Sequence, residues 1–347
     1  MNATAKSETG NTLRNVVTGA IVVAAIAAGS YWWWADRGMG GPSGPPVAVT
    51  VALNSVYAGS GLLFIAQAKN FFAAEGLNVT FKPHTSGKAA LDMLLAGGAD
   101  FASPADLPVM FAVSKGLPLV IVATITTSQS DHGIVGRKDR GIAALADLKG
   151  KRIGVTIGTS GHFVLDSSLL RARLAAGDVK PVNMKPEELM PALASGDVDA
   201  IATWEPHLGA ARERLGEGGV VFTSEEIYDA PFNVVTLRNY ARANPETIKK
   251  LLRALLRAEK FNASDPAAVR SIVAEALKTD LANAQTLLSR YRLAVTLDQS
   301  LITALENETR WAIQNKLIDG TVVPNYLEHM HLDGMLAVKP DAVTVIH

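Results

Sequence analysis

The sequence predicts an α/β protein with two doubly wound lobes, a hinge formed by two chain crossings, and one membrane helix at the N-terminus. Three observations lead to this expectation: a length of 347 residues, two similar runs of alternating strands and helices, and an uncharged apolar segment between Arg14 and Asp36. At about 100–200 residues per domain, the chain is long enough for two domains that each bury a core.

Charge and cysteine content exclude several classes of protein. The chain has 33 Lys and Arg against 33 Asp and Glu, so a nucleic acid, which needs a basic surface, is not an expected partner. It has no cysteine, which excludes disulfides, cysteine metal sites, cysteine nucleophiles and a lipid on an N-terminal cysteine. No phosphate-binding loop, dinucleotide fingerprint or H-E-x-x-H motif is present, so we expect no cofactor, no metal and no enzyme activity.

The N-terminal segment at 15–35 is long enough to cross a bilayer. Its 21 residues would form a helix of about 31 Å, and Tyr31 and three consecutive tryptophans close it where an aromatic belt would lie. Residues 1–14 would then be cytoplasmic, and the Gly- and Pro-rich stretch 36–46 would be a linker.

A cleaved signal peptide is the alternative for this segment. Its apolar centre would be Val16 to Ala28, and the small residues from Ala27 to Ser30 would offer a cleavage site. Both interpretations export residues 47–347 to the periplasmic side of the cell membrane.

Residues 47–210 contain the same pattern twice. The first pass has strands at 47–53, 77–81 and from Ala99, with helices that end at Gly76 and near Gly97. The second has strands at 152–157, 179–184 and from Val198, with helices at 163–176 and from Pro186 to Gly196. Asp100 therefore pairs with Asp199, and each pass predicts a parallel sheet with helices on both faces.

Two further strands would carry the chain between the lobes. The run from Leu119 ends in a polar stretch before His132, and the strand at 232–237 follows a second polar stretch. These crossings divide the exported part into lobe 1, at 47–127 and 232–347, and lobe 2, at 128–231. The helices predicted at 245–260, 266–278, 282–289 and 297–315 would brace lobe 1. One doubly wound domain is the alternative, but it leaves these helices unexplained.

Loops at the carboxyl ends of the strands are the candidate binding site, because ligands of doubly wound folds bind there. In the first pass this loop contains Ser55, Tyr57, Gly59 and Ser60, and in the second it contains Thr159, Ser160 and His162. Backbone amides and hydroxyls of both loops could receive an anionic group. The alternative is that these residues only cap helices.

Later strand ends add further candidates. These are Ser86, Gly87, Ser103, Asp106, Ser130, Asp131, Trp204 and Glu205. Trp204 would form a wall of the cleft, and the three carboxylates could meet an amine of the solute; capping or solvent exposure is the alternative for each. Ser160 and His162 do not form a nucleophile elbow, because the stretch reads G-T-S-G-H instead of G-x-S-x-G.

The chain resembles the nitrate/sulfonate/taurine family of ABC-transporter substrate-binding proteins. The matching segments are AGSGLLFIAQAKNFFAAEG at 58–76, GGADFA at 97–102, DLKGKRIGVTIG at 147–158, GTSGHFVLDSSLL at 158–170 and GDVDAIATWEP at 196–206. The resemblance implies a type II periplasmic-binding-protein fold that closes on a small solute and delivers it to a membrane permease with ATPase subunits. It also implies solute contacts at Ser55, Gly59, Ser60, Ser86, Ser103, Asp106, Ser130, Thr159, Ser160, His162 and Trp204.

The solute class stays open at this point. The family typically binds small anions and zwitterions such as nitrate, sulfonates and taurine. One of its branches binds heteroaromatic pyrimidines. An enzymatic branch, the thiamine-pyrimidine synthases, uses a cysteine-rich motif that this chain lacks. A membrane-tethered sensor domain is the alternative to a transport receptor.

Overall fold

A computed structural model describes residues 44–225 and 227–346 of the chain. The predicted cytoplasmic segment 1–14, the membrane or signal segment 15–35 and most of the linker lie outside these residues. In the part of the chain that the structure describes, no helix is both long and apolar enough to cross a membrane.

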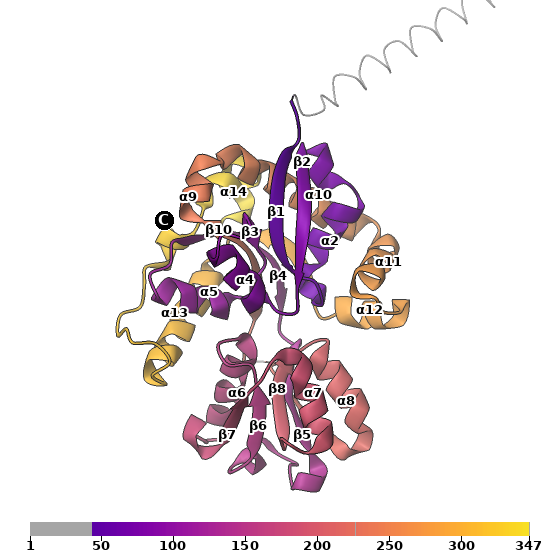
Figure 1. Ribbon diagram of the computed structural model, residues 1–347, viewed down its shortest axis with the longest axis vertical. Coiled ribbons are helices and arrows are strands. Elements are labelled where there is room, and N and C mark those ends of the chain that lie inside the picture. Colours follow the sequence, from indigo (N-terminus) through magenta and orange to yellow (C-terminus); the bar gives the residue numbers. More distant parts are fainter. Residues whose placement is uncertain (1–43, 226, 347) are drawn as a thin grey trace, which may run out of the picture. The chain divides into compact units, whose positions relative to one another are not determined.

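A six-stranded sheet forms the centre of lobe 1, which is the upper part of the ribbon in Figure 1. Its strand order is β11-β4-β10-β3-β1-β2, and the strands are β1 (Val47–Asn54), β2 (Leu77–His84), β3 (Phe101–Ala102), β4 (Leu119–Ser128), β10 (Ala230–Leu237) and β11 (Arg292–Thr296). β1 pairs in parallel with β2 and β3, whereas β10 is antiparallel to both β3 and β4.

A five-stranded sheet forms lobe 2, the lower part of Figure 1. The order is β7-β6-β8-β5-β9, with β5 (His132–Arg137), β6 (Arg152–Val155), β7 (Lys180–Asn183), β8 (Ala200–Trp204) and β9 (Gly219–Thr223). β6 is parallel to β7 and β8, and β5 is antiparallel to β8. The order β7-β6-β8 repeats β2-β1-β3, so the predicted α/β class with two duplicated sheets is confirmed.

The chain passes between the sheets twice. Residues 129–131 lead from β4 to β5, and the segment after β9 leads back to β10. Both connections are short, and in the described residues they are the two places where the chain passes from one sheet to the other.

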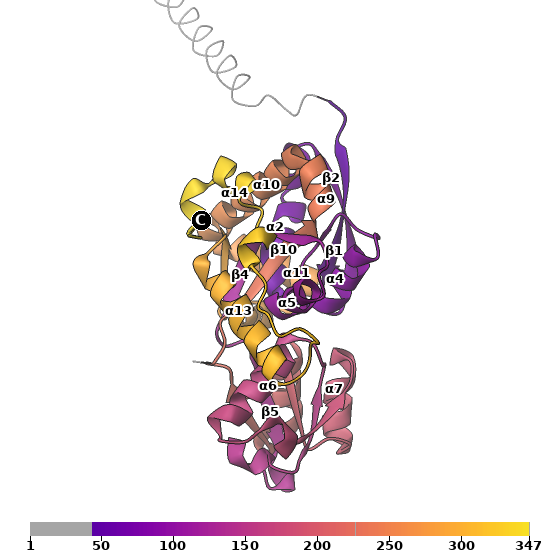
Figure 2. The ribbon, with the colours of Figure 1, turned by 90° about the vertical axis from the view of Figure 1, so that its left-hand side faces the viewer.

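Helices cover both sheets. Those of lobe 1 are α2 (Gly61–Ala68), α3 (Phe71–Ala74), α4 (Gly87–Leu95), α5 (Asp106–Ser114), α9 (Arg238–Ala243), α10 (Pro245–Ser264), α11 (Pro266–Leu277), α12 (Leu281–Leu288), α13 (Gln299–Gln314) and α14 (Leu332–Val338). Those of lobe 2 are α6 (Ser160–Arg171), α7 (Pro186–Ser195) and α8 (His207–Leu215). The predicted C-terminal helices pack on lobe 1, where α10 and α11 contact α2 and α13 contacts α5. Figure 2 shows α13 extending toward α6 of lobe 2.

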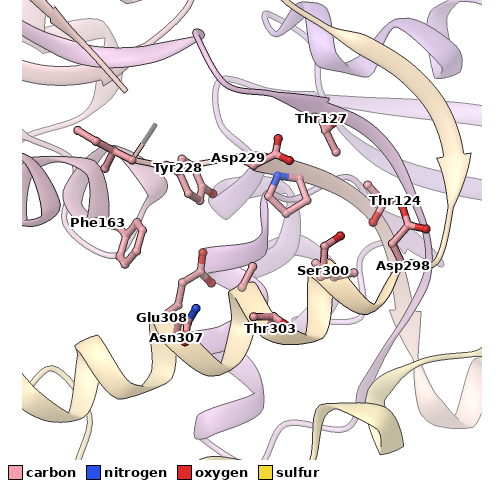
Figure 3. A pocket seen from close by; sticks show the side chains of 14 residues that line it. Thr124, Thr127, Phe163, Tyr228, Asp229, Asp298, Ser300, Thr303, Asn307 and Glu308 are labelled. Carbon is pink, nitrogen blue, oxygen red and sulfur yellow. The ribbon is translucent and has the colours of Figure 1, made fainter. Parts of the chain in front are cut away.

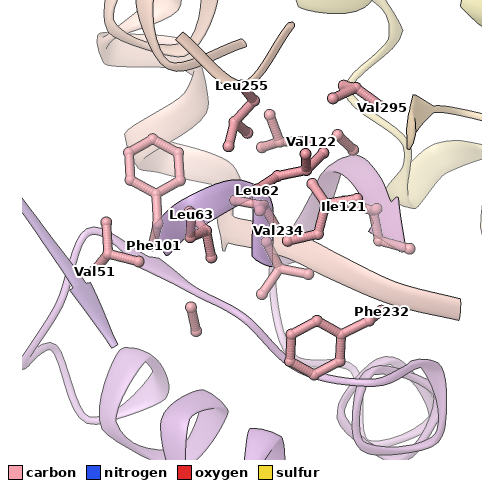
Figure 4. Packing of buried hydrophobic residues seen from close by; sticks show 14 of the residues in the cluster. Val51, Leu62, Leu63, Phe101, Ile121, Val122, Phe232, Val234, Leu255 and Val295 are labelled. Carbon is pink, nitrogen blue, oxygen red and sulfur yellow. The ribbon is translucent and has the colours of Figure 1, made fainter. Parts of the chain in front are cut away.

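The core of lobe 1 lies between its sheet and α2 and α10. Leu62, Leu63 and Leu255 meet strand residues such as Ile121 and Val234 there (Figure 4). α10 turns one apolar face inward, because Ile248, Leu251, Leu252 and Leu255 recur at helical spacing and are all buried. Lobe 2 has smaller cores of its own on the two sides of its sheet.

One predicted helix boundary is wrong. The helix expected at 163–176 is α6, which begins three residues earlier at Ser160 and ends at Arg171. Arg173 has a left-handed φ of 60°, and the amide of Leu174 donates to the carbonyl of Leu169, which ends the helix before Gly177. Ser160 and His162 are therefore helical residues.

Candidate functional site

A small cavity of about 30 Å³ lies between the two lobes. Residues from β1, α4 and β10 of lobe 1 and from β5, α6 and β8 of lobe 2 line it. The lining residues are Asn54, Tyr57, Ser86, Gly87, Lys88, Ala105, Pro108, His132, Thr159, Ser160, Trp204, Ala230, Pro231 and Phe232. As described, the cavity has room for about two water molecules.

The N-terminal ends of two helices meet at this cavity. α4 starts at Gly87 after Ser86, whose hydroxyl accepts a hydrogen bond from the amide of Ala89 at 3.2 Å. A side chain on Gly87 would place its Cβ 2.9 Å from the Cα of Pro104, so glycine is required there. α6 starts at Ser160, and the first amides of a helix have no carbonyl partner within it. Both ends therefore offer amides and a partial positive charge to an anion.

A chain of hydrogen bonds runs from lobe 1 into lobe 2 behind the cavity. The Tyr57 hydroxyl donates to Oδ2 of Asp131 at 2.6 Å. Oδ1 of Asp131 lies 2.7 Å from Nδ1 of His132, and Nε2 of His132 lies 2.7 Å from Oγ of Ser160. All four side chains are buried, and burial followed by the nearby Asp131 raises the pKa of Tyr57 well above its usual value.

Ser160, His132 and Asp131 follow one another along these hydrogen bonds in the order of a Ser–His–Asp catalytic triad. The sequence pointed to His162 as the histidine near Ser160, but the structure gives that place to His132, the first residue of β5. The arrangement fixes the ring of His132, and the ring in turn fixes the Ser160 hydroxyl at the cavity wall.

Aromatic rings form much of the remaining wall. The ring centroids of Tyr57 and Phe232 are 4.7 Å apart, and those of His132 and Trp204 are 6.2 Å apart. Gly59 makes room for the Tyr57 ring, because a Cβ at Gly59 would lie 2.2 Å from Cε1 of that ring. The cavity therefore combines polar helix ends with flat apolar surfaces.

Six of the predicted site residues line the cavity: Tyr57, Ser86, Gly87, Thr159, Ser160 and Trp204. Asp131 lies one hydrogen bond behind it, through His132. The other predicted residues are not in the lining, and most of their side chains have partners elsewhere.

Three of these residues hold the strand ends of lobe 1. Ser55 donates to the carbonyl of His84 at 3.3 Å, and Ser60 donates to the carbonyl of Asn54 at 2.7 Å. Ser103 accepts a hydrogen bond from the amide of Asn54 at 3.1 Å. They shape the loop that carries Asn54 and Tyr57, and Gly59 leaves space for the Tyr57 ring.

The last four predicted residues lie in or beside the contacts between the lobes. Asp106 accepts hydrogen bonds from Tyr228 and from the amide of Leu107. The Ser130 carbonyl accepts from Arg290, which also lies 3.7 Å from Glu205. The ring of His162 packs against Trp311 with a centroid distance of 5.2 Å.

Sequence reasoning missed eight lining residues: Asn54, Lys88, Ala105, Pro108, His132, Ala230, Pro231 and Phe232. Several have signals in the sequence. Asn54 belongs to the first candidate loop, Lys88 follows Ser86 and Gly87, and His132 follows Asp131. Among the described residues, no group of three or more His, Asp or Glu side chains is arranged to hold a metal ion.

Comparisons with known proteins show the family of this chain. The family described as "NMT1/THI5 like" matches residues 59–269. A protein of Brucella abortus strain 2308, named as a binding protein without a stated solute, is 30% identical over 69% of this chain and 75% of its own length. The taurine-binding periplasmic protein of Escherichia coli K12 is 27% identical over 58% of this chain and 63% of that protein.

A solved structure shows the same fold. The alkanesulfonate-binding protein SsuA from Xanthomonas axonopodis pv. citri, bound to MOPS, has a TM-score of 0.72 at 21% identity and covers 88% of this chain and 100% of that one. The periplasmic-binding-protein-like fold implied by the sequence motifs is thereby confirmed. The family profile matches well over half of the chain, and the chain belongs to the NMT1/THI5-like family.

Proposed function

We propose that this protein is the extracytoplasmic solute-binding component of an ABC importer. It captures a small anionic or zwitterionic solute of the nitrate, sulfonate or taurine class between lobe 1 (47–127 and 232–347) and lobe 2 (128–231). The observation that carries the proposal is the meeting of the α4 and α6 N-termini at one interlobe cavity.

The electrostatics of the cavity favour an anion. The amides at the start of α4 and α6 supply partial positive charge, and Lys88 is a cation in the lining. The Ser160 hydroxyl, held by His132, adds a hydrogen-bond partner for an oxyanion. Because the relatives named for taurine and aliphatic sulfonates are binding proteins, we assign this relay to orienting Ser160 and not to catalysis.

Binding requires the lobes to separate and close. A cavity of about 30 Å³ is too small for taurine or an alkanesulfonate, so the solute enters when the cleft is wider. Closure is stabilised by contacts across the cleft, among them the ion pair between Arg290 and Glu205 at 3.7 Å. The two crossings supply the hinge.

A flat heteroaromatic solute is the second candidate. Tyr57, Trp204 and Phe232 present rings to the cavity, and offset or edge contacts between aromatic rings add stabilisation beyond burial alone. A pyrimidine-type compound would use these walls, with Ser160 and Asn54 as its polar partners.

The partners follow from the proposed role. A receptor of this class delivers its solute to a membrane permease with ATPase subunits, on the periplasmic side of the cell membrane. An uncleaved helix at 15–35 would tether it beside the permease and raise its effective concentration there. Mass measurement of the membrane-extracted chain tests the tether, since a chain that begins near Ser30 would show cleavage.

Calorimetric titration of the full chain with nitrate, taurine, an alkanesulfonate and a pyrimidine tests the function and the class together. We expect saturable binding of an anion, weakened by Ser160→Ala and by Trp204→Ala. If only the pyrimidine binds, the second candidate is correct. If no solute binds, the role as a solute receptor is wrong.

A further inference from the structure

A second cavity of about 250 Å³ lies beside the hinge and shares one lining residue, Pro231, with the solute cavity. It is bounded by α13, by the return crossing and by the start of α6 (Figure 3). Its lining comprises Thr124, Thr127, Phe163, Ile227, Tyr228, Asp229, Pro231, Asp298, Ser300, Leu301, Thr303, Ala304, Asn307 and Glu308. It has space for a small organic molecule.

The charged groups in this lining are all acidic. Asp229, Asp298 and Glu308 contribute carboxyls, six side chains contribute hydroxyls or an amide, and no Lys, Arg or His is in the lining. Burial raises the pKa of Asp229, and Arg292 outside the lining partly opposes that rise. The lining therefore favours a cation over an anion.

Glu308 is the strongest sign of a missing partner. It is 1% exposed and occupies the buried face of α13 together with Leu301, Leu305 and Ala312. Its carboxyl faces that of Asp106, to which it can hydrogen-bond when one of the two is protonated, and neither of its oxygens has another hydrogen-bond partner among the described residues. Two buried carboxyls without a compensating positive group are unfavourable, so a proton or a bound cation must balance their charge.

Aromatic rings add a second feature that suits an organic cation. Phe163 and Tyr228 line the cavity with ring centroids 5.5 Å apart at an interplanar angle of 62°. The negative faces of such rings attract a cation, and quaternary ammonium groups are recognised by aromatic rings in this way.

We propose that this cavity binds a small organic ammonium ion, with Glu308 as its carboxylate partner and Phe163 and Tyr228 as its aromatic wall. Phe163 belongs to α6 of lobe 2, whereas Glu308 belongs to α13 of lobe 1. An occupant therefore contacts both lobes and stabilises their closed arrangement. Glu308, Phe163 and Tyr228 do not line the solute cavity, and the existence of the site does not depend on the proposed transport function.

Calorimetry with the full chain tests the site directly. The probes are choline and 3,3-dimethylbutan-1-ol, which has the same shape without the charge. We expect choline to bind at least about tenfold more tightly than the alcohol, because only the ammonium gains from the carboxylate and the rings. Glu308→Gln should weaken choline binding by about tenfold or more.

Matched variants distinguish binding at this site from a general effect of charge or of stability. Asp229→Asn removes a carboxylate at the exposed rim and should also weaken choline binding without risk to the fold. Glu306→Gln removes a charge from the same helix outside the lining and should leave binding unchanged. Thermal melting of each variant verifies that it is folded. Absence of choline binding, equal binding of choline and the alcohol, or unchanged binding by both lining variants would overturn the proposal.

Discussion

The indole Nε1 of Trp311, on α13 of lobe 1, donates a hydrogen bond of 3.1 Å to Oδ2 of Asp166, on α6 of lobe 2. The same indole packs edge-on against Phe163 with a centroid distance of 5.3 Å. Burial raises the pKa of Asp166, and the hydrogen bond from Trp311 acts in the opposite direction. This contact joins the lobes only when they are close, so it belongs to the closed state.

Trp311→Phe should weaken solute binding by keeping the ring but removing the donor. A hydrogen bond to a charged group contributes about 1.5–3 kcal/mol, which corresponds to a loss of about 10- to 100-fold in affinity. Calorimetry with the solute found in the panel measures the loss. Asp166→Asn should produce a smaller loss on its own, and the double variant should be no worse than Trp311→Phe. Wild-type affinity in Trp311→Phe would show that the contact does not contribute to closure.

Ser160→Ala should weaken anion binding by about fivefold or more, since a neutral hydrogen bond contributes about 1 kcal/mol. The change also leaves Nε2 of His132 without its protein partner. Ser168→Ala is the matched control, because Ser168 is buried on the same helix and lies outside the cavity. Calorimetric titration with the anion should show a loss of affinity for Ser160→Ala and an unchanged affinity for Ser168→Ala. Equal affinities would place Ser160 outside the binding site.

The internal duplication was the most predictable part of the fold, because the same residue types recur where the backbone needs them. Oδ2 of Asp100 accepts from the amide of Thr50 at 2.7 Å, and Oδ2 of Asp199 accepts from the amide of Arg152 at 2.9 Å. Each aspartate directly precedes the third strand of its pass and ties it to the first. The pairing of Asp100 with Asp199 was therefore visible in the sequence.

Elements that are buried on all sides were not predictable in the same way. Seven of the nine residues of α5 are buried, so no polar face marks it as a helix. The role of His132 could not be predicted for a different reason. Its partner Ser160 is 28 positions away, and the packing of α6 against β5 places the two side chains at one cavity wall.

Glu308→Gln should raise the thermal stability of the ligand-free protein as pH increases. Burial, followed by the neighbouring carboxylate of Asp106, raises the pKa of Glu308 well above its usual 4.5. The folded state therefore keeps this proton at pH values where the unfolded chain has lost it, and the wild type loses stability as pH rises through the folded pKa. Glutamine has no such loss.

The melting temperatures of Glu308→Gln and wild type should therefore agree near pH 4 and diverge in favour of the variant above it. A gain of about 1 kcal/mol would appear as roughly 2 °C for a chain of this size. Scans in choline-free buffer at a series of pH values measure the difference. A gap that does not change with pH would mean that Glu308 is already balanced by another group.

Asp199→Asn should destabilise lobe 2 at neutral pH, with an effect that disappears in acid. Burial alone raises the pKa of Asp199, but hydrogen bonds from the amide and guanidinium of Arg152 outweigh it, so the pKa lies below the usual 3.8. A lowered pKa in the folded state contributes stability above the unfolded pKa, and this contribution is lost as pH falls through the folded value. We expect a cost of about 1–2 kcal/mol at pH 7 in urea unfolding, shrinking toward zero below about pH 4.

Asp197→Asn, at an exposed position two residues away, should leave stability unchanged at both pH values. A cost for Asp199→Asn that stays constant down to pH 3 would show that the side chain acts through its shape and not through its charge.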